Sequence, residues 1–352
     1  MSSGLPSVDV IVPCYNYAHY LPDCVGSVLA QTGVRLRVLI ADDASPDETE
    51  AVARRLMRHD RRVAYRRNPA NLRNIANYNS ALHWVKADFV AILSADDLMM
   101  PGALERAVAL MLAHPQVAMA YGRALYFTGP QEPQALLSGA VAARSWPYNP
   151  AEGYADGAPA ELTARELADI LPGHPPISGT RAFFRQNRFA NQVHMSSAVV
   201  RTVVQRRVGG YDPALPHAGD FEMWLRLATQ GPIGFIDRFQ VSARMHEANM
   251  SSGYYADRTA DFRQRALALD AIEAGWGESL PPGLMAEMRR GLAISILRAG
   301  SDDEMLRLAL AQDPGITATA AGRLLVLKQR LHLGALLPFA VKQAALRALH
   351  LA

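Results

Sequence analysis

Short apolar segments alternate with segments of helical periodicity through the first 125 residues, and this alternation constrains the fold more than any other feature of the chain. The apolar segments are β-branched-rich and strand-sized, at 8–13, 35–41, 62–67, 88–94 and 116–122. The segments between them have helical spacing, at 19–32, 47–60, 75–86 and 101–114. Because apolar strands alternate with helix-sized crossovers, the pattern predicts an α/β fold with a mostly parallel sheet flanked by helices.

The sequence changes character after this alternating region. Residues 128–162 are rich in Pro, Gly and Ala with little periodicity, and long irregular segments in compact domains are often lids or substrate loops. We therefore expect residues 128–192 to form an acceptor or lid segment. From about residue 253 onward the sequence is Ala- and Leu-rich with helical spacing, which predicts a helical C-terminal region over 253–352.

Composition narrows the class of protein. Half of the 352 residues are apolar, which is enough for a sizeable core, and a net charge of +3 does not indicate a nucleic-acid partner. Two cysteines, Cys14 and Cys24, are too few for a disulfide framework and fit a reducing cytoplasm. The sequence has neither a secretory signal pattern nor a stretch of roughly 18 to 20 apolar residues, so we expect a soluble or peripheral cytoplasmic protein.

Polar side chains follow several strands of the predicted sheet, where the carboxyl ends of the strands meet. They are Tyr15, Asp42, Asp43, Asp96 and Asp97. Carboxylates crowded at one edge raise each other's pKa unless a cation or hydrogen-bond donors compensate. Carboxylate oxygens suit Mg²⁺ or Mn²⁺, which also bind substrate phosphates, so a diphosphate ligand is expected here. Alternatively, Asp96 or Asp97 caps the helix that follows.

Two later residues are further candidates. Asp220 lies in the first turn of a predicted amphipathic helix, where the helix dipole favours its ionised form and leaves it able to accept a proton. The same pattern is typical of an ordinary capped helix. His246 follows a predicted strand beside a polar turn; it is either structural or, if a metal binds nearby, a ligand for an ion such as Mn²⁺.

In their order and spacing these segments resemble the family 2 glycosyltransferases, which have a GT-A fold. The resemblance covers roughly residues 7–252 and is carried by "VIVPCYNYAHYLPDCVGSVLAQT", "LIADDASPDET", "ILSADDLMMPGALE", "HMSSAVVR", "VGGYDPAL", "GDFEMWLRLA" and "RMHEANMS". It implies a GT-A domain over 1–252. It also implies inverting transfer of a sugar from a nucleotide-diphosphate donor, expected to be a UDP-sugar, to an acceptor hydroxyl.

The resemblance implies a donor-nucleotide site made of Pro13, Tyr15, Asp42, Asp43, Arg73 and Asp96. Tyr15 is expected to border or stack on the base, and Asp43 to hydrogen-bond it with Asp42 beside it. A carboxylate that accepts from the imide N–H of uracil favours UDP, because cytosine and adenine have no donor at the equivalent ring nitrogen. Asp96 is expected to hold the ribose. Arg73 is expected near the donor, although a solvent-facing helix start is equally consistent with its position.

The resemblance also implies the catalytic groups. Asp97 and His246 are expected to bind Mn²⁺ or Mg²⁺, and Asp220 to act as the general base towards the acceptor hydroxyl. The chain departs from the family pattern at two positions. Ser94 and Gly219 stand where many members have an acidic residue, which affects the expected metal affinity in the first case and a helper interaction in the second.

Other functions and partners remain open from the sequence. A sugar nucleotidyltransferase is disfavoured because no Gly-rich basic loop follows the first strand, and a catalytically lapsed sugar-nucleotide-binding or scaffold protein is the non-enzyme alternative. The acceptor is expected to be a polysaccharide, a lipid-linked glycan or a protein. The basic, Leu-rich C-terminal helices either pack on the core or on a second subunit, or contact the inner face of the membrane peripherally.

Overall fold

The computed structural model describes residues 4–128, 144–146, 177–246, 249, 257–299 and 303–318, and a few residues between 322 and 327. Most of the expected lid segment at 128–192 and most of the basic C-terminal sequence lie outside these residues. Within them, no helix has the length and apolar character that crossing a membrane requires. The chain divides into two compact units. The first holds the described residues up to Thr180 together with Gln192–Asn249, and the second holds Arg181–Asn191 and those from 257 onward.

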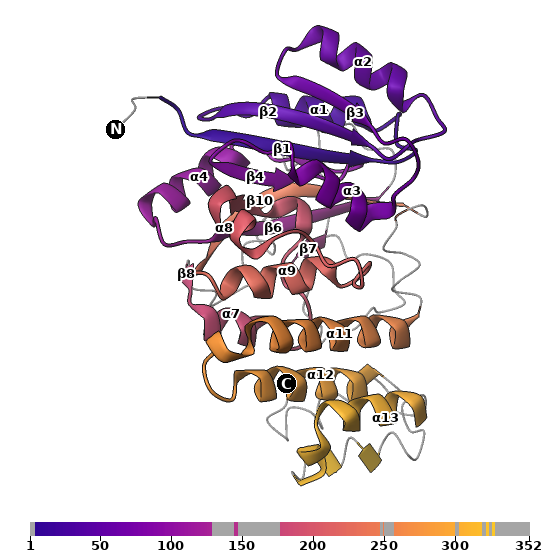
Figure 1. Cartoon of the computed structure of the whole chain (residues 1–352), viewed down its shortest axis with the longest axis vertical. Helices are drawn as coiled ribbons and strands as arrows, with labels where there is room; N and C mark the ends of the chain where they lie inside the picture. Colours follow the sequence, from indigo (N-terminus) through magenta and orange to yellow (C-terminus); the bar gives the residue numbers. More distant parts are fainter. Residues whose placement is uncertain are drawn as a thin grey trace. The chain divides into compact units, whose positions relative to one another are not determined.

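A single mixed sheet forms the centre of the first unit (Figure 1). Its strands, in spatial order, are β3 (Val63–Arg67), β2 (Arg35–Asp42), β1 (Ser7–Cys14), β4 (Phe89–Ile92), β9 (Val199–Arg201), β6 (Met119–Thr128), β10 (Ile233–Met245) and β5 (Leu98–Met99). Two short strands pair at its sides: β7 (Arg144–Trp146) with β6, and β8 (Ile177–Ser178) with β10. The longer ladders, β3-β2-β1-β4 and β6-β10, are parallel, whereas β9 is antiparallel to both neighbours. The predicted α/β fold with a mostly parallel sheet is confirmed.

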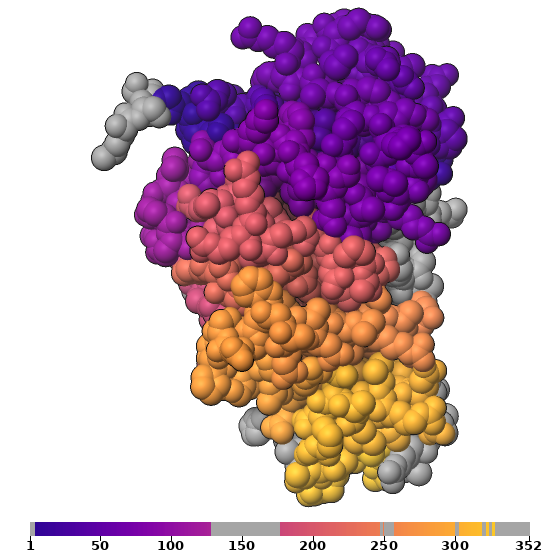
Figure 2. Space-filling view, in the orientation of Figure 1, coloured from indigo at the N-terminus to yellow at the C-terminus, as the bar shows by residue number. Residues whose placement is uncertain are grey.

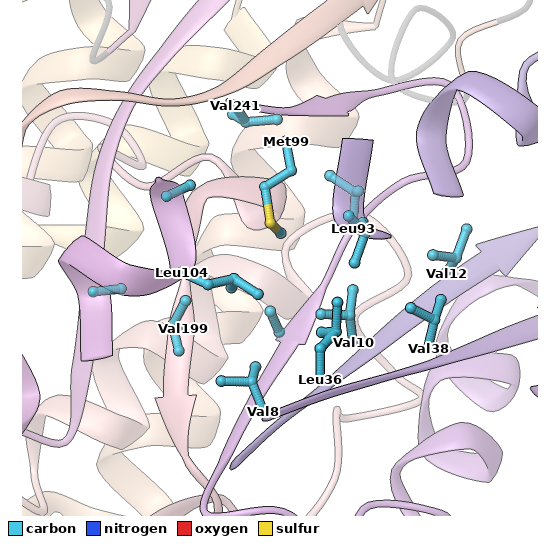
Figure 3. Packing of buried hydrophobic residues seen from close by; sticks show 14 of the residues in the cluster. Val8, Val10, Val12, Leu36, Val38, Leu93, Met99, Leu104, Val199 and Val241 are labelled. Carbon is cyan, nitrogen blue, oxygen red and sulfur yellow. The ribbon is translucent and has the colours of Figure 1, made fainter. Parts of the chain in front are cut away.

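Four helices match the segments that the alternating pattern predicts: α1 (Leu21–Leu29), α2 (Thr49–His59), α3 (Arg73–Leu82) and α4 (Ala103–Ala113). Two more follow β9: α8 (Thr202–Val208) and α9 (Gly219–Ala228), of which α9 contains the predicted amphipathic helix at Asp220. The core fills the space between the sheet and its helices with side chains such as Val8, Val10, Leu36, Leu93 and Leu104 (Figure 3). Val8, Val10 and Leu36, which lie in the parallel strands β1 and β2, are almost fully buried, which explains why these strands read as apolar runs.

The second unit is helical, as expected for the C-terminal region. It contains most of α7 (Thr180–Asn187), α11 (Arg258–Trp276), α12 (Leu284–Ala299) and α13 (Asp303–Gln312). Helix α12 packs against both α11 and α13, and their atoms form a continuous surface, orange to yellow in Figure 2. Arg181 and Arg185 of α7 form ion pairs with Glu287 of α12, with N···O distances of 2.6 and 2.5 Å. Their charges therefore stabilise packing within this unit.

Candidate functional site

The carboxyl ends of β1 and β2 lie side by side, because their parallel register pairs Cys14 with Asp42. The ladder continues for one more hydrogen bond, from Asp43 N to the carbonyl of Cys14 at 2.9 Å. Pro13 is half-buried and pairs with Ala41, one position before the last pair of this ladder. Tyr15 follows the strand, with 47% of its surface exposed. An exposed aromatic ring beside a buried carboxylate is an arrangement suited to a planar heterocyclic ligand.

Asp42 and Asp43 have different environments. The carboxylate of Asp42 is fully buried, and its Oδ2 accepts from Tyr65 Oη and Arg67 Nη1, both at 2.7 Å. Its Oδ1 accepts from the backbone N–H of Ser45 at 2.8 Å. Asp42 therefore holds the loop after β2 and the end of β3 in place. Of the two expected donor contacts, Asp43 is the one that keeps an oxygen available.

Backbone strain concentrates in the loops around this pair. Among the described non-glycine residues, positive φ angles occur at Asn16 (61°), Ala44 (61°) and Arg73 (66°), after β1, after β2 and at the start of α3. Side chains with a Cβ adopt this region only at a cost, and such residues cluster at functional sites. The side chain of Arg73 is exposed at the start of α3, as the sequence suggests.

Asp96 lies after β4 and contacts the end of β10. Its Oδ2 is 3.1 Å from His246 Nε2 and accepts a hydrogen bond from Asn249 Nδ2, also at 3.1 Å. The His246 ring makes an edge contact with Tyr17, at 5.5 Å between ring centres, in the loop after β1. That loop also contacts the loop after β2, since Asn16 N donates to Ser45 Oγ at 3.0 Å. The loop between β1 and α1 therefore contacts both the loop after β2, next to Asp43, and His246, next to Asp96.

Asp97 points to a different set of partners. Ser196, from the short 3₁₀ helix η2 (Met195–Ser197), donates to its Oδ2 at 2.7 Å, and the backbone N–H of Arg244 donates to Oδ1 at 3.2 Å. Ser94 N donates to the same Ser196 hydroxyl at 3.2 Å. The hydroxyl of Ser196 thus links Asp97 to Ser94, the position at which the chain departs from the family pattern.

The electrostatics of the two adjacent carboxylates favour a cation. Asp96 and Asp97 are 6% and 4% exposed. Burial raises the pKa of Asp96, and burial together with the neighbouring charge of Asp96 raises the pKa of Asp97 well above its usual range. A positive ion between or beside them removes this penalty.

The residues present fit a hard divalent ion at Asp96. Two neighbouring ligands of an octahedral ion, with bonds of about 2.1 Å, lie about 3 Å apart. The 3.1 Å between Asp96 Oδ2 and His246 Nε2 is compatible with this spacing. Among the described residues, no group of three or more His, Cys, Asp or Glu side chains converges on one point, so substrate oxygens and water would supply the remaining ligands. In the structure His246 contacts Asp96, and the expectation that Asp97 and His246 bind the ion stays a prediction.

Asp220 lies in the first turn of α9, and its Oδ1 accepts from the backbone N–H of Phe221 at 2.7 Å. The loop before it is held by the first turns of α3: Asn74 Nδ2 donates to the carbonyl of Pro216 at 2.8 Å. A Cβ added to Gly219 would lie 3.1 Å from the side chain of Ile75, so the lack of an acidic side chain here permits close packing of α9 on α3.

The first turn of α3 connects Asp220 with the base side of the site. Leu72 N donates to Asp43 Oδ1 at 2.9 Å, and Asn74 and Ile75 contact the residues that precede Asp220. These contacts come from three residues within the stretch 72–75, which spans roughly 5 Å along a helix. The expected donor-binding aspartate and the expected general base are therefore held by one short segment.

Several site residues were not identified from the sequence. Ser196 and Arg244 hold Asp97, Asn249 holds Asp96, and Asn68 donates to Asp43 at 2.8 Å. Three of these lie within the motifs "HMSSAVVR" and "RMHEANMS", where polar residues among apolar ones were the available signal. Asn68 follows β3 as Asp43 follows β2, so its position at a strand end was a signal as well.

Comparisons with known proteins agree with this arrangement. Residues 9–154 match the sequence profile of Glycosyl transferase family 2. An uncharacterized glycosyltransferase of Rickettsia typhi is 21% identical over 257 residues, which cover 70% of this chain and 66% of that protein. The putative glycosyltransferase EpsE of Bacillus subtilis is 34% identical over 115 residues, which cover 32% of this chain and 41% of EpsE. Chondroitin synthase of Pasteurella multocida is 34% identical over 118 residues, which cover 33% of this chain and 12% of the synthase. The chain thus spans less than two thirds of the length of these relatives.

Two solved structures share the fold. Residues 1–349 of S. aureus TarS, in complex with UDP-GlcNAc, superpose with a TM-score of 0.57 at 16% identity, covering 93% of this chain and 88% of that one. The mannosyltransferase PcManGT of Pyrobaculum calidifontis, in complex with GDP-Man and Mn²⁺, superposes with a TM-score of 0.50 at 19% identity, covering 97% and 87%. Residues 9–154 therefore carry the sequence pattern of Glycosyl transferase family 2, the relatives are similar over this region and beyond, and the fold is the GT-A fold of the two solved structures.

Proposed function

We propose that the protein is an inverting glycosyltransferase that transfers a sugar from a UDP-sugar to an acceptor hydroxyl. The observation that carries this proposal is the first turn of α3, which contacts both Asp43 and the residues before Asp220. A nucleotide site and a candidate base on one rigid segment fit a transfer reaction better than binding alone.

The donor nucleotide binds at the ends of β1 and β2 in this proposal. Tyr15 borders the base, Asp43 accepts a hydrogen bond from it, and Asp42 acts as a positioning residue through its bonds to Tyr65 and Arg67. Arg73 follows Leu72, whose backbone N–H bonds to Asp43, and its exposed side chain is proposed to contact the donor. Support for a nucleotide-sugar donor comes from the UDP-GlcNAc and GDP-Man complexes of TarS and PcManGT.

The divalent ion, Mn²⁺ or Mg²⁺, is held by Asp96 and His246, with Asp97 completing the acidic pair. When bound, it supplies positive charge to the donor diphosphate and to the leaving nucleoside diphosphate. Asn249 orients Asp96, and Ser196 orients Asp97. The Mn²⁺ in the PcManGT complex supports this choice of ion. Asp96 is also proposed to contact the ribose of the donor, as the resemblance implies.

Asp220 takes the proton from the acceptor hydroxyl as that oxygen attacks the anomeric carbon. The C–O bond to the donor diphosphate breaks as the new glycosidic bond forms on the opposite face, so the anomeric configuration inverts. Acceptors are expected among growing polysaccharides, lipid-linked glycans and proteins; similarity to chondroitin synthase supports the first class. Peripheral contact with a membrane and assembly into homo-oligomers are further expectations for the C-terminal region.

A panel of nucleotide sugars tests the proposed function. With Mn²⁺ present, we expect UDP-sugars to raise the melting temperature and at least one of them to release UDP in the presence of acceptor glycans or, slowly, of water. Stabilisation without any sugar release across a broad acceptor panel would favour a lapsed binding protein. Failure to bind any nucleotide sugar contradicts the proposal.

Removing the Asp96 carboxylate is expected to weaken Mn²⁺ binding. Asp96→Asn and His246→Ala should each raise the Kd for Mn²⁺, measured by electron paramagnetic resonance in the presence of UDP, by at least about tenfold. Asp88→Asn is the matched control, because Asp88 bonds to Ser7 before β4, at the opposite end of that strand. Unchanged Mn²⁺ affinity in both site variants would assign the ion elsewhere.

A further inference from the structure

Asp43 has one oxygen available for a ligand. Its Oδ1 accepts two hydrogen bonds, from Asn68 Nδ2 at 2.8 Å and from the backbone N–H of Leu72 at 2.9 Å. Its Oδ2 accepts no hydrogen bond from the part of the chain that the structure describes. This oxygen is also not one of the fully buried, unpaired polar atoms of that part, so it can be reached from outside the protein. Because a carboxylate oxygen has two lone pairs, Oδ1 is saturated and Oδ2 remains for a donor from outside the protein.

The orientation of Asn68 is fixed by a relay of side-chain amides that ends on the main chain. Asn77 Nδ2 donates to the carbonyl of Ala41 at 3.0 Å, so Asn77 must turn its Oδ1 towards Asn68. Asn68 Nδ2 donates to that oxygen at 3.0 Å and, with its second hydrogen, to Asp43. The two asparagines are 6% and 3% exposed. Rotating either amide by 180° would place its oxygen against another buried oxygen, which is unfavourable. Asn68 therefore always donates to Asp43 Oδ1, and Oδ2 is the one oxygen of Asp43 left to accept from a ligand.

We propose that Asn68 and Asn77 make the protein select a uracil or thymine base over guanine, by restricting Asp43 to one oxygen. The inference rests on the proposed function, because it takes Asp43 as the residue that receives the base. Uracil and thymine present one imide N–H between two carbonyl oxygens, which matches a single acceptor. Guanine presents two adjacent donors, N1–H and the N2 amino group, whose N–H bonds are nearly parallel, so each forms a linear hydrogen bond only when both oxygens of the carboxylate face them.

The choice between these bases is a real one for this fold, since TarS and PcManGT were solved with UDP-GlcNAc and GDP-Man, respectively. If guanine binds to Asp43 while Oδ1 is already occupied, one of the two guanine N–H donors has no acceptor. A donor left unpaired in a desolvated place lowers affinity by about 10- to 100-fold. Cytosine places a ring nitrogen lone pair against the carboxylate and is also disfavoured.

Nucleotide binding to the full chain tests the relay. Calorimetry with UDP, dTDP, GDP and CDP in the presence of Mn²⁺ should give wild-type affinities for UDP and dTDP at least about tenfold higher than for GDP and CDP. Asn68→Ala frees a lone pair on Asp43 Oδ1, so the UDP:GDP affinity ratio should fall to within about threefold. Asn77→Ala should lower the ratio in the same direction, because it removes the anchor of Asn68.

Asn79→Ala is the matched control. Asn79 lies on the same helix and bonds to the backbone of Tyr211, outside the relay, so its loss should leave the UDP:GDP ratio at the wild-type value. Wild-type protein that binds GDP as tightly as UDP overturns the inference and leaves the proposed function standing. Protein that binds no nucleoside diphosphate overturns the proposed function itself. Folded Asn68→Ala or Asn77→Ala protein with the wild-type ratio shows that the relay does not select the base.

Discussion

Replacing Asp220 by Asn is expected to lower the turnover number of sugar transfer by about 10²- to 10⁴-fold. The amide has nearly the shape of the carboxylate but cannot accept the proton of the acceptor hydroxyl, so the chemical step loses its base. Binding of UDP should stay within about threefold of wild type, because the proposal assigns the contact with the uracil ring to Asp43 and the contribution of Asp220 to the transition state alone. Steady-state kinetics and UDP calorimetry on the same preparation measure both quantities.

Asp212→Asn is the matched control for this prediction. Asp212 lies in the same loop, 209–218, and carries the same charge, and its side chain accepts a local hydrogen bond from Ala214 N at 2.9 Å. We expect its turnover to remain within about threefold of wild type. If Asp220→Asn transfers sugar at the wild-type rate, the base is another residue. If both variants fail equally, the loop geometry and not the Asp220 carboxylate is responsible.

The α/β fold and the acidic edge of the sheet follow from local patterns. Strand and helix periods can be read within each segment, and parallel strands end at one edge of a sheet. The same patterns treat Asp42 and Asp43 alike. The structure separates them, because the register of β2 against β3 brings Tyr65 and Arg67 to Asp42, whereas Asn68 meets Asp43. Register between strands is a tertiary property, so local patterns could not separate the roles of adjacent aspartates; only the family resemblance proposed different roles for them.

The partners of Asp96 and Asp97 show a second limit. Ser196 is 99 residues from Asp97, and His246 is 150 residues from Asp96. These contacts depend on β9 inserting antiparallel between β4 and β6, and on β5 pairing with β10, which brings the residues just before β5 beside the end of β10. Motif spacing identifies His246 as a site residue but does not say which carboxylate it meets. The structure assigns its contact to Asp96.

Helix α9, which begins with Gly219 and Asp220, contains a buried ion pair, and breaking this pair is expected to destabilise the first unit strongly. Glu222 and Arg226 are one helical turn apart in α9, with 4% and 11% of their side chains exposed and an N···O distance of 2.5 Å. Arg226 Nη1 also donates to the carbonyls of Val208 and Gly210, at 2.8 and 2.9 Å, at the start of the loop that leads to Asp220. Burial raises the pKa of Glu222, although Arg226 opposes this shift.

Arg226→Met should lower the free energy of unfolding by about 3 to 5 kcal/mol, because it leaves Glu222 buried without a counter-charge and two carbonyls without donors. This is a large part of the roughly 5 to 15 kcal/mol by which folded domains are stable. Urea denaturation followed by circular dichroism measures it. In the double variant Glu222→Leu, Arg226→Met the buried charge is gone, so the loss should be smaller by about 1 to 3 kcal/mol and should reflect mainly the two carbonyls.

The same double variant separates stability from catalysis. If the Arg226 guanidinium sets the path of loop 209–218 into α9, then both variants should show a lower turnover at temperatures where they are folded, with UDP binding kept, because the position of Asp220 changes while Asp43 does not. Turnover that recovers with stability in the double variant would mean that the ion pair acts on folding alone. Equal loss of turnover in both variants, despite their different stabilities, would make Arg226 a positioning residue for the proposed base.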